Sequence, residues 1–170
     1  QSVVYQAPEV IAQSPDVTHC EGASETLIVV TSGTPPLTYQ WKKEGQVING
    51  ATDSTYTLVA LGLADAASYT CEVSSSLVDT DESDPVMLVV NPELTVSIDI
   101  EATTTSICAG ELVDFTATPA NGGATPTYTW QLNGTAIGGN QDQLTLDYLA
   151  DGDMVTCILA SSATCTAANP

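Results

Sequence analysis

The stretch Leu61-Gly-Leu-Ala-Asp65-Ala-Ala-Ser-Tyr69-Thr-Cys71 decides how the rest of the chain is interpreted. Tyr69 stands two residues before Cys71 and four residues after Asp65, and Trp41 lies 30 residues before the cysteine. A tyrosine at this place ties the turn that leads into a strand, and a tryptophan at this distance packs beside the cysteine between two sheets. We therefore expect Trp41 and Tyr69 to mark the core of a β-sandwich.

The same landmarks return in the second half of the chain. The corresponding pairs are Cys20 and Cys108, Trp41 and Trp130, and Cys71 and Cys157, which lie 88, 89 and 86 residues apart. A repeat of this length has the size of one sandwich rather than of a solenoid unit. Trp130 is accordingly expected in a second core, but Val155 stands where the first copy has Tyr69.

In these landmarks the chain resembles the immunoglobulin fold, and more narrowly the tandem immunoglobulin-like repeats of large bacterial cell-surface proteins of the adhesin type. The resemblance implies an all-β protein with two tandem immunoglobulin-like β-sandwich domains, over residues 1–91 and 92–170. Asn91-Pro92 is expected to be a short, stiff joint. Residues 1–6 would form an N-terminal extension of the first domain.

The two halves differ at their last strand. Residues 85–90 form an apolar run that is expected to complete the first sandwich as its final strand. After Leu159, by contrast, the sequence contains no further Val, Ile, Leu or aromatic residue. We therefore expect the second sandwich to lack its own final strand.

The charge of the chain excludes some classes of partner. The chain contains two lysines, no arginine and 21 acidic residues, which gives a net charge of −19 at pH 7. Nucleic-acid binding requires cations against phosphates, so a nucleic-acid partner is not expected. Attraction to an anionic membrane surface is excluded on the same ground. No apolar run approaches the roughly 20 residues of a membrane helix, so no membrane insertion is expected.

Five cysteines in a small all-β chain favour an oxidising, extracellular or cell-surface location. The favoured pairs are Cys20 with Cys71 and Cys108 with Cys157, each closing a loop of about 50 residues. Cys165 is then the odd cysteine. It could instead pair with Cys157 or with Cys108, or remain unpaired.

Two further places are candidate sites, each with a simpler structural interpretation. Asp79, Asp81 and Asp84 offer oxygen ligands that suit Ca²⁺, although their spacing matches no calcium loop and a solvated hairpin tip is the favoured interpretation. Asn133-Gly-Thr135 is a glycosylation sequon, although Asn-Gly also forms a turn unaided. No other cofactor is indicated. No set of residues has the spacing of a catalytic site, so the chain is not expected to be an enzyme.

We expect a structural or adhesive unit of a cell-surface fibre or filament. One rival is an adhesion module that binds a host or cell-surface glycan or protein, although the loops offer few exposed aromatic anchors. Another is an accessory domain of a secreted enzyme. Fold alone does not decide between them.

The two ends of the sequence suggest how copies could join. The segment Ser2-Val3-Val4-Tyr5-Gln6 is rich in β-forming residues and is surplus to the first sandwich. We expect it to complete the second domain of a neighbouring copy by strand addition. Such a head-to-tail contact would build an open homopolymer. The alternative is that the chain is a fragment, with the missing strand supplied by residues that follow it.

Overall fold

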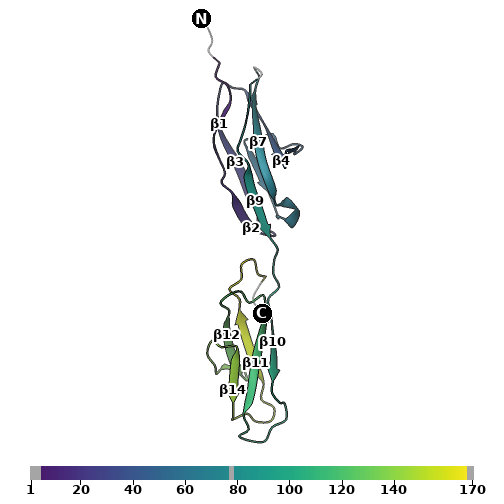
Figure 1. The fold of residues 1–170 in the computed structure, drawn as a ribbon, viewed down its shortest axis with the longest axis vertical. Helices are drawn as coiled ribbons and strands as arrows, with labels where there is room; N and C mark the ends of the chain where they lie inside the picture. Colours follow the sequence, from purple (N-terminus) through teal and green to yellow (C-terminus); the bar gives the residue numbers. More distant parts are fainter. Residues whose placement is uncertain (1–4, 77–78, 168–170) are drawn as a thin grey trace. The chain divides into compact units, whose positions relative to one another are not determined.

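The structure, a computed structural model, describes residues 5–76 and 79–167. The chain divides into two compact units, residues 1–92 and 93–170, which we call domain 1 and domain 2. Each consists of two facing sheets, drawn in Figure 1. The all-β architecture of two tandem sandwiches that the sequence predicts is confirmed.

Domain 1 contains a three-stranded sheet and a larger sheet. The first has the order β1-β3-β6, formed by β1 (Glu9–Gln13), β3 (Glu25–Ser32) and β6 (Thr55–Leu58). The second has the order β2-β9-β7-β4-β5, formed by β2 (Val17–Cys20), β9 (Val86–Asn91), β7 (Ala67–Ser75), β4 (Leu37–Lys43) and β5 (Gln46–Val47). A short strand, β8 (Thr80–Glu82), also pairs with β7, and a 3-10 turn, η1 (Leu63–Asp65), precedes β7.

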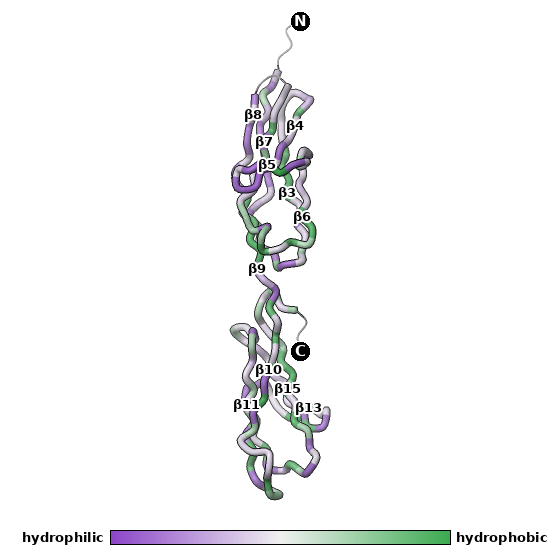
Figure 2. Tube along the Cα trace, turned by 90° about the vertical axis from the view of Figure 1, so that its right-hand side faces the viewer, coloured by the Kyte–Doolittle hydropathy of each residue, from purple (hydrophilic) through white to green (hydrophobic). Residues whose placement is uncertain are grey.

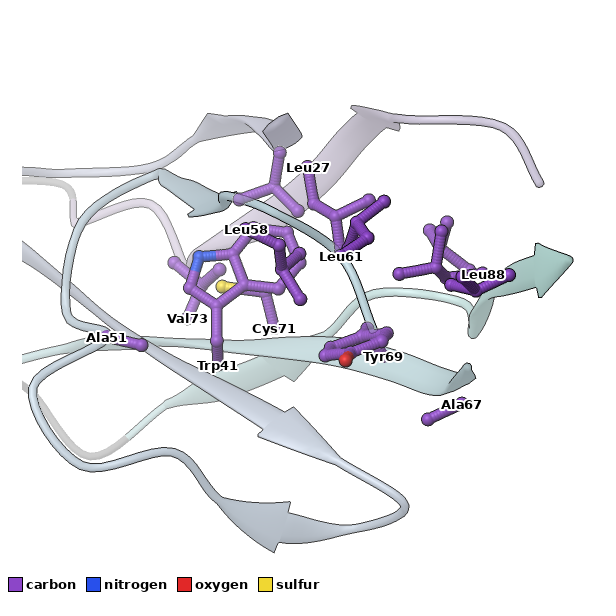
Figure 3. Packing of buried hydrophobic residues seen from close by; sticks show 13 residues of the cluster. Leu27, Trp41, Ala51, Leu58, Leu61, Ala67, Tyr69, Cys71, Val73 and Leu88 are labelled. Atoms are coloured by element: carbon purple, nitrogen blue, oxygen red, sulfur yellow. The ribbon is translucent and has the colours of Figure 1, made fainter. Parts of the chain in front are cut away.

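Alternation of side chains along the strands creates the core of domain 1. Along β7 and β9 every second residue is buried, as period-two strands between a core and solvent require. Figure 2 shows the hydrophobic residues along β3 and β9 in green. Figure 3 shows side chains from both sheets gathered around Trp41, which is fully buried.

The polar atoms of the buried aromatic residues have partners. The Tyr69 hydroxyl donates to the backbone oxygen of Asp65 at 2.8 Å, across the turn formed by η1. Burial, and then the nearby Asp65 carboxylate, raise the pKa of Tyr69 to about 12. The Trp41 indole N–H donates to the Asp53 oxygen at 2.9 Å. Each polar group is thus satisfied inside an apolar core.

Domain 2 has three strands in each sheet. One sheet has the order β10-β11-β14, formed by β10 (Ser97–Ala102), β11 (Val113–Ala120) and β14 (Gln143–Leu146). The other has the order β13-β12-β15, formed by β13 (Thr135–Ala136), β12 (Thr127–Leu132) and β15 (Val155–Ala160). Trp130 is fully buried between them, with its indole N–H bonded to the Gln141 oxygen at 2.8 Å.

Candidate functional site

Strand β9 closes the larger sheet of domain 1. It pairs in parallel with β2 on one side and antiparallel with β7 on the other. Leu88 lies opposite Val17 of β2 and Ala67 of β7. Val86, Leu88 and Val90 point into the core and are almost fully buried. This one strand therefore satisfies two sheet edges and covers part of the core.

No strand among the described residues of domain 2 takes this place. Within the described part of the chain, strand β15, which corresponds to β7, pairs only with β12. Residues 105–108, which correspond to β2, form no strand, and residues 105–107 make no backbone–backbone hydrogen bond in the described part of the chain. In domain 1, β9 lies between β2 and β7. Among the described residues, no strand lies between the corresponding segments of domain 2, residues 105–108 and β15.

The free edge of β15 can be identified from its hydrogen bonds. The Trp130 oxygen accepts the N–H of Ile137, so Trp130 turns its backbone towards β13. Cys157 lies opposite Trp130 in the antiparallel pair of β12 and β15. Two opposite residues of such a pair direct their backbone N–H and C=O groups either both towards each other or both away from each other. Cys157, and with it Val155 and Leu159, therefore directs N–H and C=O groups towards the open side. In domain 1 the equivalent Cys71 oxygen accepts the N–H of Ser83 at 3.0 Å.

A cavity of about 700 Å³ lies beside this edge. Its apolar floor includes Val113, Phe115 and Val155. Residues 104–107 line one side, and residues 149–153, which lead into β15, line another. We call the space between residues 104–107 and β15 the open groove. An apolar floor beside the free edge of β15 suits an extended peptide strand.

The mouth of the open groove is acidic. The Asp153 carboxylate accepts hydrogen bonds from the Ala150 N–H and the Asn133 side-chain amide, each at 2.8 Å. These bonds, the Ala150 N–H first, lower the pKa of Asp153, so this side chain is negatively charged at neutral pH. Asp151 lines the same cavity.

The described residues after β15 turn towards the start of domain 2. Thr166 forms a parallel bridge with Leu94. The Leu94 N–H donates to the Cys165 oxygen at 2.7 Å, and the Ala167 N–H donates to the Leu94 oxygen at 3.0 Å. Leu94 precedes β10, so this segment does not lie beside Val155, where the groove is open.

The segment predicted to join copies lies only in part within the described residues. Ser2, Val3 and Val4 are outside them. Tyr5 is exposed, with 58% of its surface accessible. The Gln6 N–H donates to the Thr34 hydroxyl, and the Thr34 N–H donates to the Gln6 oxygen. Gln6 is thus tied to domain 1, while Tyr5 stands outside its core.

The predicted cysteine pairs Cys20–Cys71 and Cys108–Cys157 are wrong. Cys71, Cys108 and Cys157 are free thiols, so the alternative pairs of Cys165 with Cys157 or Cys108 are wrong as well. Cys20 and Cys165 are each disulfide-bonded.

The sheet order explains the error. Cys20 lies on β2 and Cys71 on β7, in one sheet with β9 between them. Two strand spacings amount to about 10 Å, whereas bridged cysteines have Cα atoms less than about 7 Å apart. Cys108 and Cys157 are likewise on the opposite walls of the open groove. Sequence spacing alone does not reveal that a strand, or a space for one, separates such residues.

The structure does not bring the calcium candidates together. The Asp81 carboxylate accepts the Val10 N–H at 2.7 Å, and the Asp79 backbone oxygen accepts the Ser75 N–H. The Asp84 backbone oxygen accepts the Gln13 side-chain amide. Among the described residues, no group of three or more His, Cys, Asp or Glu side chains could hold a metal ion. Asp81 and Asp84 instead accept hydrogen bonds from β1, and Asp79 accepts one from the end of β7.

Asn133, the glycosylation candidate, has a structural role in its turn. It has a left-handed backbone (φ 50°) and precedes Gly134 (φ 80°), as a tight hairpin turn requires. Its side-chain oxygen accepts the Met154 N–H at 2.9 Å, and its amide nitrogen donates to Asp153. The nitrogen that would carry a glycan thus supports the start of β15. Glycosylation of Asn133 stays a prediction.

Sequence reasoning missed residues 104–107 as one wall of the groove. The available signal was a comparison of the two copies. Val17 and His19 of β2 correspond to Thr105 and Ile107, in a run of threonine and serine that lacks the strand character of the first copy.

A family model described as "Immunoglobulin domain" matches residues 7–75. The decoration protein of Escherichia phage T5 is 40% identical over 73 residues, which are 42% of this chain and 44% of that protein. The match thus covers less than half of this curated relative. In the described part of the chain, no helix has the length and apolar character needed to span a membrane.

Solved structures with a similar fold include fragments of titin. The I-band fragment I67-I69 matches with a TM-score of 0.56 at 18% identity, over 95% of this chain and 62% of that one. An E-to-A variant of the same three domains matches with a TM-score of 0.54 at 19% identity, over 93% of this chain and 62% of that one. The chain therefore has the fold of tandem immunoglobulin-like domains, and the match to the family model lies within domain 1. The narrower resemblance to bacterial surface proteins stays a prediction.

Proposed function

We propose that the chain is a non-enzymatic structural subunit of an extracellular assembly on a cell or virion surface, in which copies join head to tail. The open groove of domain 2 carries this proposal. A sandwich with an unpaired edge and an uncovered floor is a template for a strand from another chain. The name of the phage relative, a decoration protein, supports a structural role.

The segment Ser2–Gln6 is the strand that we propose for this contact. It has adjacent valines and a tyrosine, residue types that favour strands. Donor and acceptor are different surfaces of the chain, so the contact repeats without closing and extends into a filament. The disulfide-bonded state of Cys20 and Cys165 supports an extracellular setting.

Substitution within the donated segment tests this function. Val4→Asp places a charge in a strand that must pack against an apolar floor and next to acidic residues. Ile11→Asp is a matched control, since Ile11 is an exposed residue of β1, with 58% of its surface accessible. We expect electron microscopy and size-exclusion chromatography to show filaments of the wild-type chain and of Ile11→Asp, but only monomers of Val4→Asp. Equal assembly of all three proteins would contradict strand donation.

A second function is favoured by the same relative. The chain could bind as separate copies to a capsid or cell surface, as a decorating or adhesive module for a protein or glycan. Tyr148, with 58% of its surface exposed, is one aromatic residue available for such a contact. In this case the purified chain would stay monomeric in solution and would be found only on the surface that it coats.

A further inference from the structure

We infer that the strand in the open groove runs parallel to residues 105–108, with Val4 of a second copy at the position that Val90 has in domain 1. Tyr5 of that copy then lies opposite Cys108. The inference rests on the proposed head-to-tail assembly, and it specifies the direction, register and facing residues of the contact.

The direction follows from the repeat. In domain 1, β9 is parallel to β2 and antiparallel to β7, with Val17 opposite Leu88 and Cys20 opposite Asn91. The equivalents of β2 and β7 in domain 2 are residues 105–108 and β15. A strand in the place of β9 has the same direction. The part of it that aligns with Leu88–Asn91 lies beside residues 105–108 and Asp153, ahead of the start of β15.

The register follows from a short sequence match between the segment and β9. Val89-Val90 stand three residues before Pro92-Glu93, and Val3-Val4 stand five residues before Pro8-Glu9. Both valine pairs thus precede a Pro-Glu pair at the start of a sandwich, with two more residues between valine and proline in the second case. Aligning the valines places Val4 opposite Ile107 and Tyr5 opposite Cys108.

Side chains on the two walls agree with this register. In domain 1, Leu88 lies between two apolar residues, Val17 and Ala67. The corresponding wall residues of domain 2 are Thr105 and Asp153, and the register places Ser2 between them. Ser2 is polar where its neighbours are polar.

The next inward position and the charge agree as well. Val4 meets Ile107, which is partly buried and packs against the core of domain 2. Val3 points outwards, as Val89 does in β9, where 41% of its surface is exposed. Residues 1–8 contain no Asp or Glu in a chain with 21 of them, so the segment adds no acidic charge beside Asp151 and Asp153.

The competing occupant is a strand of the same chain. The described residues after β15, 161–167, are serine, alanine, threonine and cysteine. None of them has an aliphatic side chain larger than that of alanine. They are also held at Leu94 by two backbone hydrogen bonds. They therefore offer no aliphatic side chain comparable to Val4 for the floor.

Cysteine cross-linking tests the register. Cys108 is exposed and free, whereas the other two free thiols, Cys71 and Cys157, are buried. We expect Tyr5→Cys to form disulfide-linked ladders on a non-reducing gel under mild oxidation. Peptide mapping should identify the link between position 5 and Cys108. The controls are Glu9→Cys, on exposed β1, and Tyr5→Cys combined with Cys108→Ser, and each should give at least tenfold less ladder.

The same samples are imaged for filaments, which separates two failures. Filaments in which position 5 cross-links no better than position 9 would overturn the register while leaving the assembly intact. Absence of filaments from the wild-type chain would overturn the assembly itself. A link that forms within monomers would show that the groove is filled by the same chain.

Discussion

At the scale of single residues, the two core cysteines act as small apolar side chains. Cys71 is completely buried beside Trp41, and Leu27 and Val29 of the facing sheet are also buried. No cysteine of that facing strand is present to complete a bridge across the core. Burial raises the pKa of Cys71 to about 11 and also raises the pKa of Cys157. Both are therefore protonated and unreactive at neutral pH.

Thiol labelling of the monomeric chain tests this assignment. A thiol reagent at about pH 8 should modify Cys108 rapidly, because Cys108 is exposed, and should leave Cys71 and Cys157 unmodified. In denaturant without reductant, three cysteines per chain should react, in agreement with the three free thiols. Labelling of Cys20 or Cys165 before reduction would contradict the disulfide-bonded state of these residues.

The folded chain also loses stability at high pH through these groups. The folded-state pKa of Cys71 is raised to about 11 and that of Tyr69 to about 12. A raised pKa means that folding favours the protonated form of the group. The contribution of each group to the free energy of unfolding is therefore complete below its pKa in the unfolded chain, and it is lost as the pH rises through its pKa in the folded chain.

At the scale of elements, a pairing partner decides whether a segment is a strand. Residues 17–20 form β2 because β9 lies beside them, whereas residues 105–108 form none. The sequence predicted the sandwiches and the missing strand, because apolar alternation and the spacing of Trp41, Tyr69 and Cys71 are local signals. It did not predict the cysteine states, because these depend on which strands are neighbours in a sheet.

The missing strand should make domain 2 the less stable unit. In domain 1, β9 buries Val86, Leu88 and Val90, and each such side chain contributes about 1.5–3 kcal/mol. Each domain has one tryptophan, so Trp130→Phe leaves domain 1 as the only source of tryptophan fluorescence, and Trp41→Phe leaves domain 2. In urea, we expect the domain 2 signal of monomers to change at a lower concentration than the domain 1 signal. The free energy of unfolding of domain 2 should be lower by about 3 kcal/mol or more. Coincident transitions of the two signals would contradict this expectation.

At the scale of the whole molecule, both lysines of the chain already have acidic or backbone partners. Lys42 pairs with Glu72 at 2.8 Å and with Glu82 at 3.2 Å. Lys43 donates to the Ala64 oxygen at 2.6 Å and lies 3.8 Å from the Asp65 carboxylate. These are the only lysines, and there is no arginine. Copies that join head to tail therefore meet against a net charge of −19 on each chain.

This charge predicts how the assembly depends on salt. The screening length falls from about 30 Å at 0.01 M to about 3 Å at 1 M ionic strength. Repulsion between copies is thus largely removed at high salt, whereas the apolar and backbone contacts of the groove are retained. We expect the concentration at which filaments form, measured by sedimentation, to fall at least several-fold over this range. Val4→Asp serves as the control, because its sedimentation should stay low throughout. Attachment to a basic surface would show the reverse, because salt weakens attraction between opposite charges. Sedimentation of the purified chain that decreases as salt rises would therefore contradict homopolymer formation through apolar and backbone contacts.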